Sequence, residues 1–143
     1  MKRTIIKNAN IINDHKIFES DILIEDSFIS KISKSISPSF PNTKIIDVEG
    51  NFVIPGLIDD QVHFREPGLT HKGNIYTESR AAVAGGITSY FEMPNTQPNT
   101  TTIHELNKKF DIAKENSIAN FSFMFGGTNT NLEEIVKNNI CLL

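Results

Sequence analysis

The sequence predicts an α/β fold in two segments, and two observations carry this prediction. Residues 1–51 hold short β-branched runs separated by turn residues, which is typical of a small β-sandwich or meander. Residues 52–143 alternate strand-like and helix-like patterns, which indicates a parallel sheet with right-handed crossovers. A chain of 143 residues is long enough to bury a sizeable core.

The first segment is expected to contain five short strands, at 4–7, 10–13, 21–25, 28–32 and 44–48. Asn8 and the cluster at 13–15 are turn candidates, because Asn and Asp tolerate turn conformations. Asp26-Ser27 reads as a hairpin turn. The stretch 30–43 is rich in Ser and Pro and resembles a linker.

The second segment opens with an apolar run at 53–58, broken by Pro55-Gly56, which predicts a short buried strand. Asn74 is expected to cap a helix that runs to about Ala84 and stops at Gly85-Gly86. The next strand is expected at 87–92, because Pro94 cannot donate to a sheet ladder.

Further along, Thr102 and Glu105 predict a capping box for a second helix. Its apolar face carries Ile103, Leu106, Phe110 and Ala113. A third strand is expected at 118–125, with its alternating phenylalanines in the core.

Thr130 and Glu133 form another candidate capping box, opening a helix to about Asn138. Residues 140–143 read as the start of a fourth strand.

Polar side chains alternate at the end of the first strand of the second segment. Asp59, Gln61, His63 and Arg65 fall on one side of an extended chain. A strand end can carry polar residues simply because it is solvated. However, the carboxyl ends of parallel strands share one rim, so Asn95 and Gly126-Gly127 are expected to approach these residues.

Composition narrows the function classes. The formal charge is −3 and the pI is near 5.8, and the chain has no basic stripe, which argues against nucleic acid as a partner. Cys141 is the single cysteine, so no internal disulfide can form, which fits a reducing, cytoplasmic compartment. No apolar stretch is long enough for a signal peptide or a membrane span.

Four ordered motifs resemble the cyclic amidohydrolase branch of the metal-dependent amidohydrolase superfamily, and most of all the class I dihydroorotases. They lie at 55–59, 62–68, 79–88 and 93–96. The Met-Pro-Asn-Thr motif at 93–96 favours dihydroorotase over hydantoinase or allantoinase.

This resemblance implies a partial TIM-like (β/α)₈ barrel, its first three to four strands in residues 52–143, beside a small β-sandwich segment in residues 1–51. It implies reversible hydrolysis of (S)-dihydroorotate to N-carbamoyl-L-aspartate in pyrimidine (UMP) biosynthesis, with one or two Zn²⁺ ions in the full-length enzyme. Zinc lowers the pKa of bound water from 15.7 to about 7. His63 and Gln61 are then the metal-binding candidates, and Arg65 and Asn95 the substrate-binding candidates.

Two features depart from the family pattern. The usual His-x-His is Gln61-x-His63 here, and an amide oxygen is a poorer zinc ligand than imidazole. A barrel takes about 250 residues, so the remaining ligands and the catalytic aspartate would lie beyond Leu143. No catalytic base is assigned, and the chain alone is expected to be inactive and to aggregate through open sheet edges.

Two alternatives stay open at this point. One is another cyclic amidohydrolase, such as a hydantoinase or an allantoinase. The other is a non-catalytic pseudo-dihydroorotase that supports aspartate transcarbamoylase, which Gln61 favours. A homo-oligomer is a further expectation, and the substrate is expected to be a small molecule.

Overall fold

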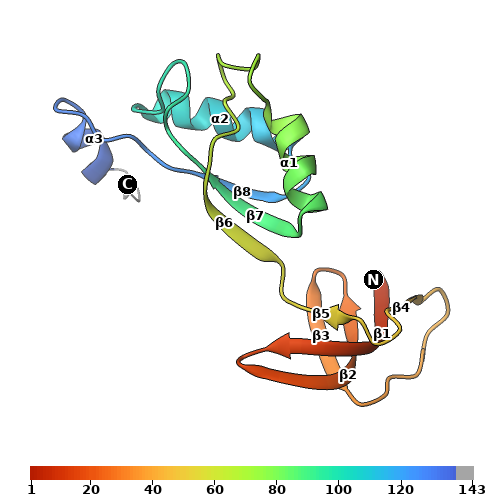
Figure 1. Cartoon of the computed structure of the whole chain (residues 1–143). Helices are drawn as coiled ribbons and strands as arrows, with labels where there is room; N and C mark the ends of the chain where they lie inside the picture. Colours follow the sequence, from red (N-terminus) through yellow and green to blue (C-terminus); the bar gives the residue numbers. More distant parts are fainter. Residues whose placement is uncertain (138–143) are drawn as a thin grey trace. The chain divides into compact units, whose positions relative to one another are not determined.

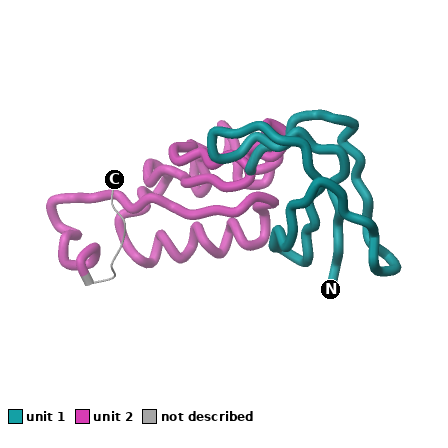
Figure 2. Tube along the Cα trace, turned by 90° about the horizontal axis from the view of Figure 1, so that it is seen from below, with its two compact units in different colours: residues 1–55 teal, residues 56–143 magenta. Residues whose placement is uncertain are grey.

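The computed structural model of the chain describes residues 1–137, and it contains two compact units, Met1–Pro55 and Gly56–Leu143 (Figure 2). The fourth strand predicted at 140–143, together with Cys141, lies outside the described residues. No helix within the described part of the chain is long and apolar enough to cross a membrane.

The first unit is a single five-stranded sheet (Figure 1). Its strands are β1 (Arg3–Asn13), β2 (Lys16–Glu25), β3 (Phe28–Ser33), β4 (Lys44–Asp47) and β5 (Phe52–Val53). The first three form an antiparallel meander, and β4 and β5 both pair with β1 in parallel. Residues 1–55 thus contain the predicted meander in a single sheet, and the expectation that this sheet is part of a β-sandwich stays a prediction.

One long strand, β1, replaces the two short strands predicted around Asn8. Asn8 adopts φ 56°, and the register of β1 with β2 shifts between Ile6 and Ala9. This is a β-bulge, which lets a strand continue past a residue in the left-handed region. The predicted turn at 13–15 and the hairpin turn at Asp26 are both present, with Asp14, His15 and Asp26 at positive φ.

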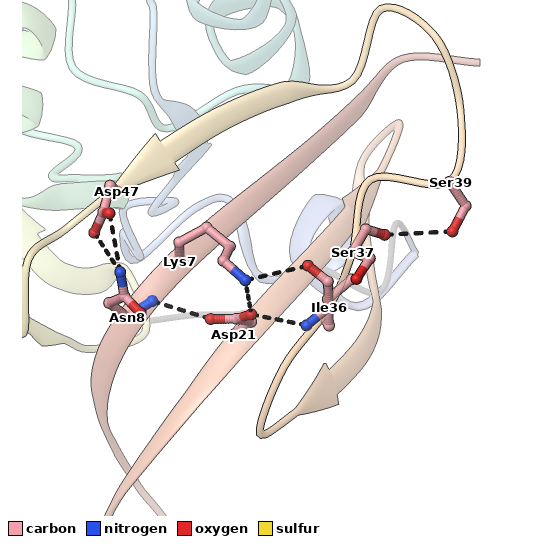
Figure 3. Close-up of polar contacts among 7 residues, drawn as sticks. All are labelled: Lys7, Asn8, Asp21, Ile36, Ser37, Ser39 and Asp47. Carbon is pink, nitrogen blue, oxygen red and sulfur yellow. Dashed lines mark hydrogen bonds and ion pairs between the residues drawn. The ribbon is translucent and has the colours of Figure 1, made fainter.

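Asp21 is the centre of a group of polar contacts in the first unit (Figure 3). Its side chain is almost fully buried. Its carboxylate accepts hydrogen bonds from Lys7 Nζ and from the backbone N–H groups of Asn8 and Ile36. Burial by itself would raise the pKa of Asp21, but these three donors together lower the pKa below its ordinary value. The carboxylate thus fixes the bulge of β1 and the segment that follows β3.

We expect Asp21→Asn to lower the free energy of unfolding at pH 7 by about 2 kcal/mol, because hydrogen bonds to charged groups contribute about 1.5–3 kcal/mol. A lowered pKa in the folded state gives stability above the unfolded value of about 3.9, which is lost as pH falls through the folded pKa. The difference between wild type and variant should therefore shrink below about pH 4.

Urea unfolding between pH 7 and pH 3, followed by circular dichroism, measures this difference. Asp14→Asn makes the same chemical change in an exposed turn and serves as the control. An Asp21→Asn variant as stable as this control at pH 7 would contradict the assigned role.

The second unit is a three-stranded parallel sheet with helices in its crossovers (Figure 1). Its elements are β6 (Leu57–Val62), α1 (Ile75–Ala84), β7 (Ile87–Glu92), α2 (Ile103–Asn116), β8 (Asn120–Phe123) and α3 (Leu132–Lys137). The strand order β6-β7-β8 follows the chain, as the alternation of strand and helix predicted.

Two of the three predicted helix caps are present. Asn74 accepts from the Thr77 N–H at the start of α1. Thr102 accepts from the Glu105 N–H at the start of α2, but the Glu105 side chain does not bond back to Thr102, so only half of that predicted capping box is present. The predicted capping box at Thr130 was wrong, because Asn131 is the residue that precedes α3. The Asn131 carboxamide is held by Thr101 O and Gly126 O, which sets where the helix begins.

The core of the second unit lies between the sheet and the helices α1 and α2, which also contact each other. Phe121 and Phe123 join it, as predicted, and Phe123 meets Phe110 edge-on. The predicted buried strand at 53–58 was wrong. β5 ends at Val53 in the first unit, and Ile58 in β6 is 67% exposed.

Candidate functional site

The predicted alternation at the end of β6 is present from Gln61 to Phe64. Val62 and Phe64 are buried in the core, whereas Gln61 and His63 are exposed. Because side chains alternate along a strand, the buried pair holds the exposed pair on the opposite side. The alternation stops at Arg65, whose φ of 72° lies in the left-handed region.

Past that point the chain turns towards α1. The Glu66 carboxylate accepts a hydrogen bond of 2.8 Å from the Ile75 N–H, in the first turn of the helix. A carboxylate at a helix N-terminus satisfies an unpaired N–H and interacts favourably with the helix dipole. Glu66 therefore fixes the loop after β6 to the beginning of α1.

His63 and Asn95 meet at the carboxyl ends of two neighbouring strands. His63 Nδ1 lies 2.9 Å from Asn95 Oδ1. With the amide oxygen as acceptor, Nδ1 carries the hydrogen, and Nε2 keeps a free lone pair. The structure thus brings together two residues that are 32 positions apart and were both predicted to belong to one site.

The loops that carry these residues are joined directly. The Met93 N–H donates to Val62 O at 3.0 Å, and the Gln97 N–H donates to Pro67 O at 3.1 Å. Gly68 has φ 85°, and a Cβ atom at this position would lie 1.9 Å from Gln97 O. Only glycine permits this close approach of the two loops.

The third loop contacts the second one. The Gly126 N–H donates to Thr100 O at 2.8 Å, so the loop after β8 lies against the loop after β7. The carboxyl ends of β6, β7 and β8 therefore lie at the same edge of the sheet, as the predicted parallel order requires.

Gln61 and Asp59 lie just before His63 on β6. Asp59 Oδ1 accepts from the Gln61 N–H at 3.1 Å, which shapes the backbone beside the exposed Gln61 side chain. Among residues 1–137, no group of three or more His, Cys, Asp or Glu side chains is arranged to hold a metal ion. One imidazole nitrogen and one amide oxygen do not close the four-ligand shell that zinc requires.

A buried ion pair beneath the two loops was not predicted from the sequence. Glu92 ends β7 and Lys109 lies in α2, and they are 1% and 0% exposed. Lys109 Nζ contacts the Glu92 carboxylate and also donates to Met93 O at 3.0 Å. Glu92 Oε1 accepts from the Arg65 N–H at 3.2 Å, which is how Arg65 joins this region.

Burial is the main cause of the pKa shifts of Glu92 and Lys109. Removal from water raises the pKa of Glu92 and lowers the pKa of Lys109, and the attraction between the two charges opposes both shifts. Lys109 falls inside the apolar face of α2, three residues after Leu106 and four before Ala113. This position is the sequence signal that could have revealed a buried lysine.

Comparison with solved structures identifies the class of fold. The L-hydantoinase (dihydropyrimidinase) from Arthrobacter aurescens matches 97% of this chain and 31% of its own, with a TM-score of 0.90 and 35% identity. The D-hydantoinase (dihydropyrimidinase) from Thermus sp. matches 94% of this chain and 30% of its own, with a TM-score of 0.79 and 27% identity. The fold of this chain is therefore that of the cyclic amidohydrolases.

The family is identified by sequence. The Dihydro-orotase-like family model matches residues 50–126, and the chain belongs to this family. The dihydroorotase of Carboxydothermus hydrogenoformans is 47% identical over 110 residues, covering 73% of this chain and 25% of the relative. That of Methanosarcina acetivorans is 42% identical over 130 residues, covering 91% and 27%. The chain spans about a quarter of the length of these curated relatives.

Proposed function

We propose that this chain is the amino-terminal part of a dihydroorotase, which interconverts (S)-dihydroorotate and N-carbamoyl-L-aspartate in pyrimidine biosynthesis. The observation that carries the proposal is the pairing of His63 with Asn95 across two strand ends, at 2.9 Å. Both residues lie within the family match at 50–126. In this proposal the second unit is the first part of a (β/α)₈ barrel, whose active sites lie at the carboxyl ends of the strands.

His63 is proposed as a metal ligand through Nε2. Its Nδ1–H is engaged by Asn95 Oδ1, which fixes the ring orientation and the tautomer that leaves Nε2 free. Gln61, two residues earlier on the same side of β6, would supply a weaker oxygen ligand. Zinc, once held, would activate a water molecule and polarise the carbonyl that is attacked. The described residues supply part of that ligand shell, and other residues would have to complete it.

Arg65 and Asn95 are proposed to bind the substrate. Dihydroorotate carries a carboxylate, and the planar guanidinium of Arg65 can bind it through two parallel hydrogen bonds. Asn95 uses its oxygen to accept from His63, so its amide N–H groups remain able to donate to the substrate. Together they would orient the ring of the substrate beside the metal ligands.

A second candidate is hydantoinase activity, which the TM-score of 0.90 and 35% identity to the Arthrobacter aurescens enzyme favour. The identities of 42–47% to dihydroorotases favour the first candidate. The cytoplasmic location, a homo-oligomer and a complex with aspartate transcarbamoylase stay predictions.

A hybrid enzyme tests the proposal. Residues 1–126 of this chain replace the corresponding segment of the Methanosarcina acetivorans dihydroorotase, which supplies the rest of the barrel. We expect the purified hybrid to hydrolyse dihydroorotate. A monodisperse, folded hybrid without this activity, measured beside an active parent enzyme, would contradict the proposal.

A further inference from the structure

Besides contacting each other, Glu92 and Lys109 each make one further hydrogen bond, and these two hydrogen bonds reach different loops. Glu92 Oε1 accepts from the Arg65 N–H, in the loop after β6. Lys109 Nζ donates to Met93 O, at the start of the loop after β7. One ion pair is thus bonded to both loops that carry the candidate site.

Each loop needs such a contact. Arg65 holds a left-handed conformation, which side chains other than glycine adopt at a cost, so neighbouring structure must stabilise it. Met93 follows the last residue of β7; its N–H still donates to Val62 O, and its carbonyl oxygen is the group that accepts from Lys109 Nζ. The loops are also joined to each other through His63 and Asn95, so a shift of one displaces the other.

An apolar pair of similar volume would suit a purely structural role as well. Replacing a buried ion pair by well-packed apolar residues is often neutral or even stabilising. What apolar side chains cannot do is accept from the Arg65 N–H or donate to Met93 O. The use of charged residues here therefore points to the two loop contacts.

We propose that Glu92 and Lys109 are positioning residues that hold the Arg65 and Met93 backbones so that His63 and Asn95 stay paired. Both side chains are buried, so this role requires no contact with the substrate. Any effect of this positioning on dihydroorotate binding rests on the proposed function. The positioning of the two loop backbones does not depend on which substrate the protein binds.

The test compares two double variants of the hybrid enzyme, with metal removed and without substrate, by amide hydrogen exchange and by NMR of the histidine ring nitrogens. Glu92→Met with Lys109→Met removes both loop contacts and leaves no unpaired charge. Glu92→Gln with Lys109→Met restores only an oxygen that can accept from the Arg65 N–H. Tyr90→Phe is the control, because it removes the hydrogen bond to Ser117 from the same core.

The first readout is the exchange rate of the Arg65 amide hydrogen relative to the core amides of β7. We expect this ratio to rise at least about tenfold in the Met/Met variant, since one hydrogen bond is worth roughly a factor of ten. The Gln/Met variant should return the ratio to near the wild-type value. A change in overall stability alone would speed both sets of amides together, and so would leave the ratio unchanged.

The second readout is the pair of ring ¹⁵N shifts of His63. We expect the unsubstituted hybrid to show the tautomer with hydrogen on Nδ1, and the Met/Met variant to move towards the mixture of a free imidazole. If the Met/Met variant does not fold, the Gln/Met variant carries the test, because it has lost the bond to Met93 O. Unchanged His63 shifts together with an unchanged exchange ratio in a folded Met/Met variant would overturn the proposal, and so would unchanged His63 shifts in the Gln/Met variant if only that variant folds. Neither readout depends on the activity of the hybrid enzyme.

Discussion

Replacing His63 by alanine in the hybrid enzyme is expected to lower kcat/KM for dihydroorotate by more than about 100-fold. Loss of a residue that merely orients a metal ligand already costs about 10–100-fold, and a direct ligand should cost more. The variant should also hold less zinc after dialysis, because the imidazole is the stronger of the two ligands that this chain offers. Steady-state kinetics and metal analysis of the same sample measure both effects.

The matched control is His104→Ala. His104 is an exposed histidine of α2, 84% exposed at its side chain, and it is not part of the candidate site. We expect this variant to keep the kinetic constants and the zinc content of the hybrid. Equal losses in the two histidine variants would show that the effect at His63 is not specific to the site.

The second large effect is expected for Lys109→Met. This change leaves the Glu92 carboxylate buried without its counter-charge, and removing one partner of a buried pair costs about 3–5 kcal/mol. The free energy of unfolding, measured by urea denaturation at pH 7, should fall by that amount. A marginally stable chain would then be largely unfolded at 25 °C.

Two further variants isolate the cause of this loss. Lys114→Met removes an exposed lysine from the same helix, where it pairs with Asp111, and should cost less than about 1 kcal/mol. Adding Glu92→Gln to Lys109→Met removes the orphaned charge, and should recover most of the lost stability. No recovery in the double variant would mean that Lys109 stabilises the core by packing instead.

Local signals predicted most of the elements of the second unit. Asn74 and Thr102 each cap a helix because a short polar side chain can satisfy an unpaired backbone N–H, and the sequence shows this directly. The alternation of strand and helix predicted that the strands of this sheet run parallel. This in turn predicted that His63 and Asn95 lie together at the carboxyl-terminal edge of the sheet.

Long-range pairing was the part that local signals could not supply. The short strands β4 and β5 pair with β1 across about 40 residues, and no local pattern distinguishes one sheet from two. Asn8 was predicted as a turn because Asn favours positive φ, but the carboxylate of Asp21 holds it within a continuous strand. In both cases a distant partner decided the local conformation.

The buried pair was missed for a related reason. A lysine and a glutamate are normally exposed, and only their contact with each other allows both to be buried. Lys109 occupies an apolar position of α2, but its partner lies 17 positions earlier, at the end of β7. Periodicity shows that the position is unusual and does not identify the partner.

The ratio of kcat/KM for dihydroorotate to kcat/KM for hydantoin, measured on the hybrid enzyme, tests the central claim most directly. The claim is that residues 1–126 supply the Gln61, His63, Arg65 and Asn95 part of a dihydroorotase pocket. It predicts a clear preference for dihydroorotate, because the guanidinium of Arg65 has a carboxylate to bind only in that substrate. A folded hybrid that prefers hydantoin, or that hydrolyses neither compound beside an active parent, would contradict it.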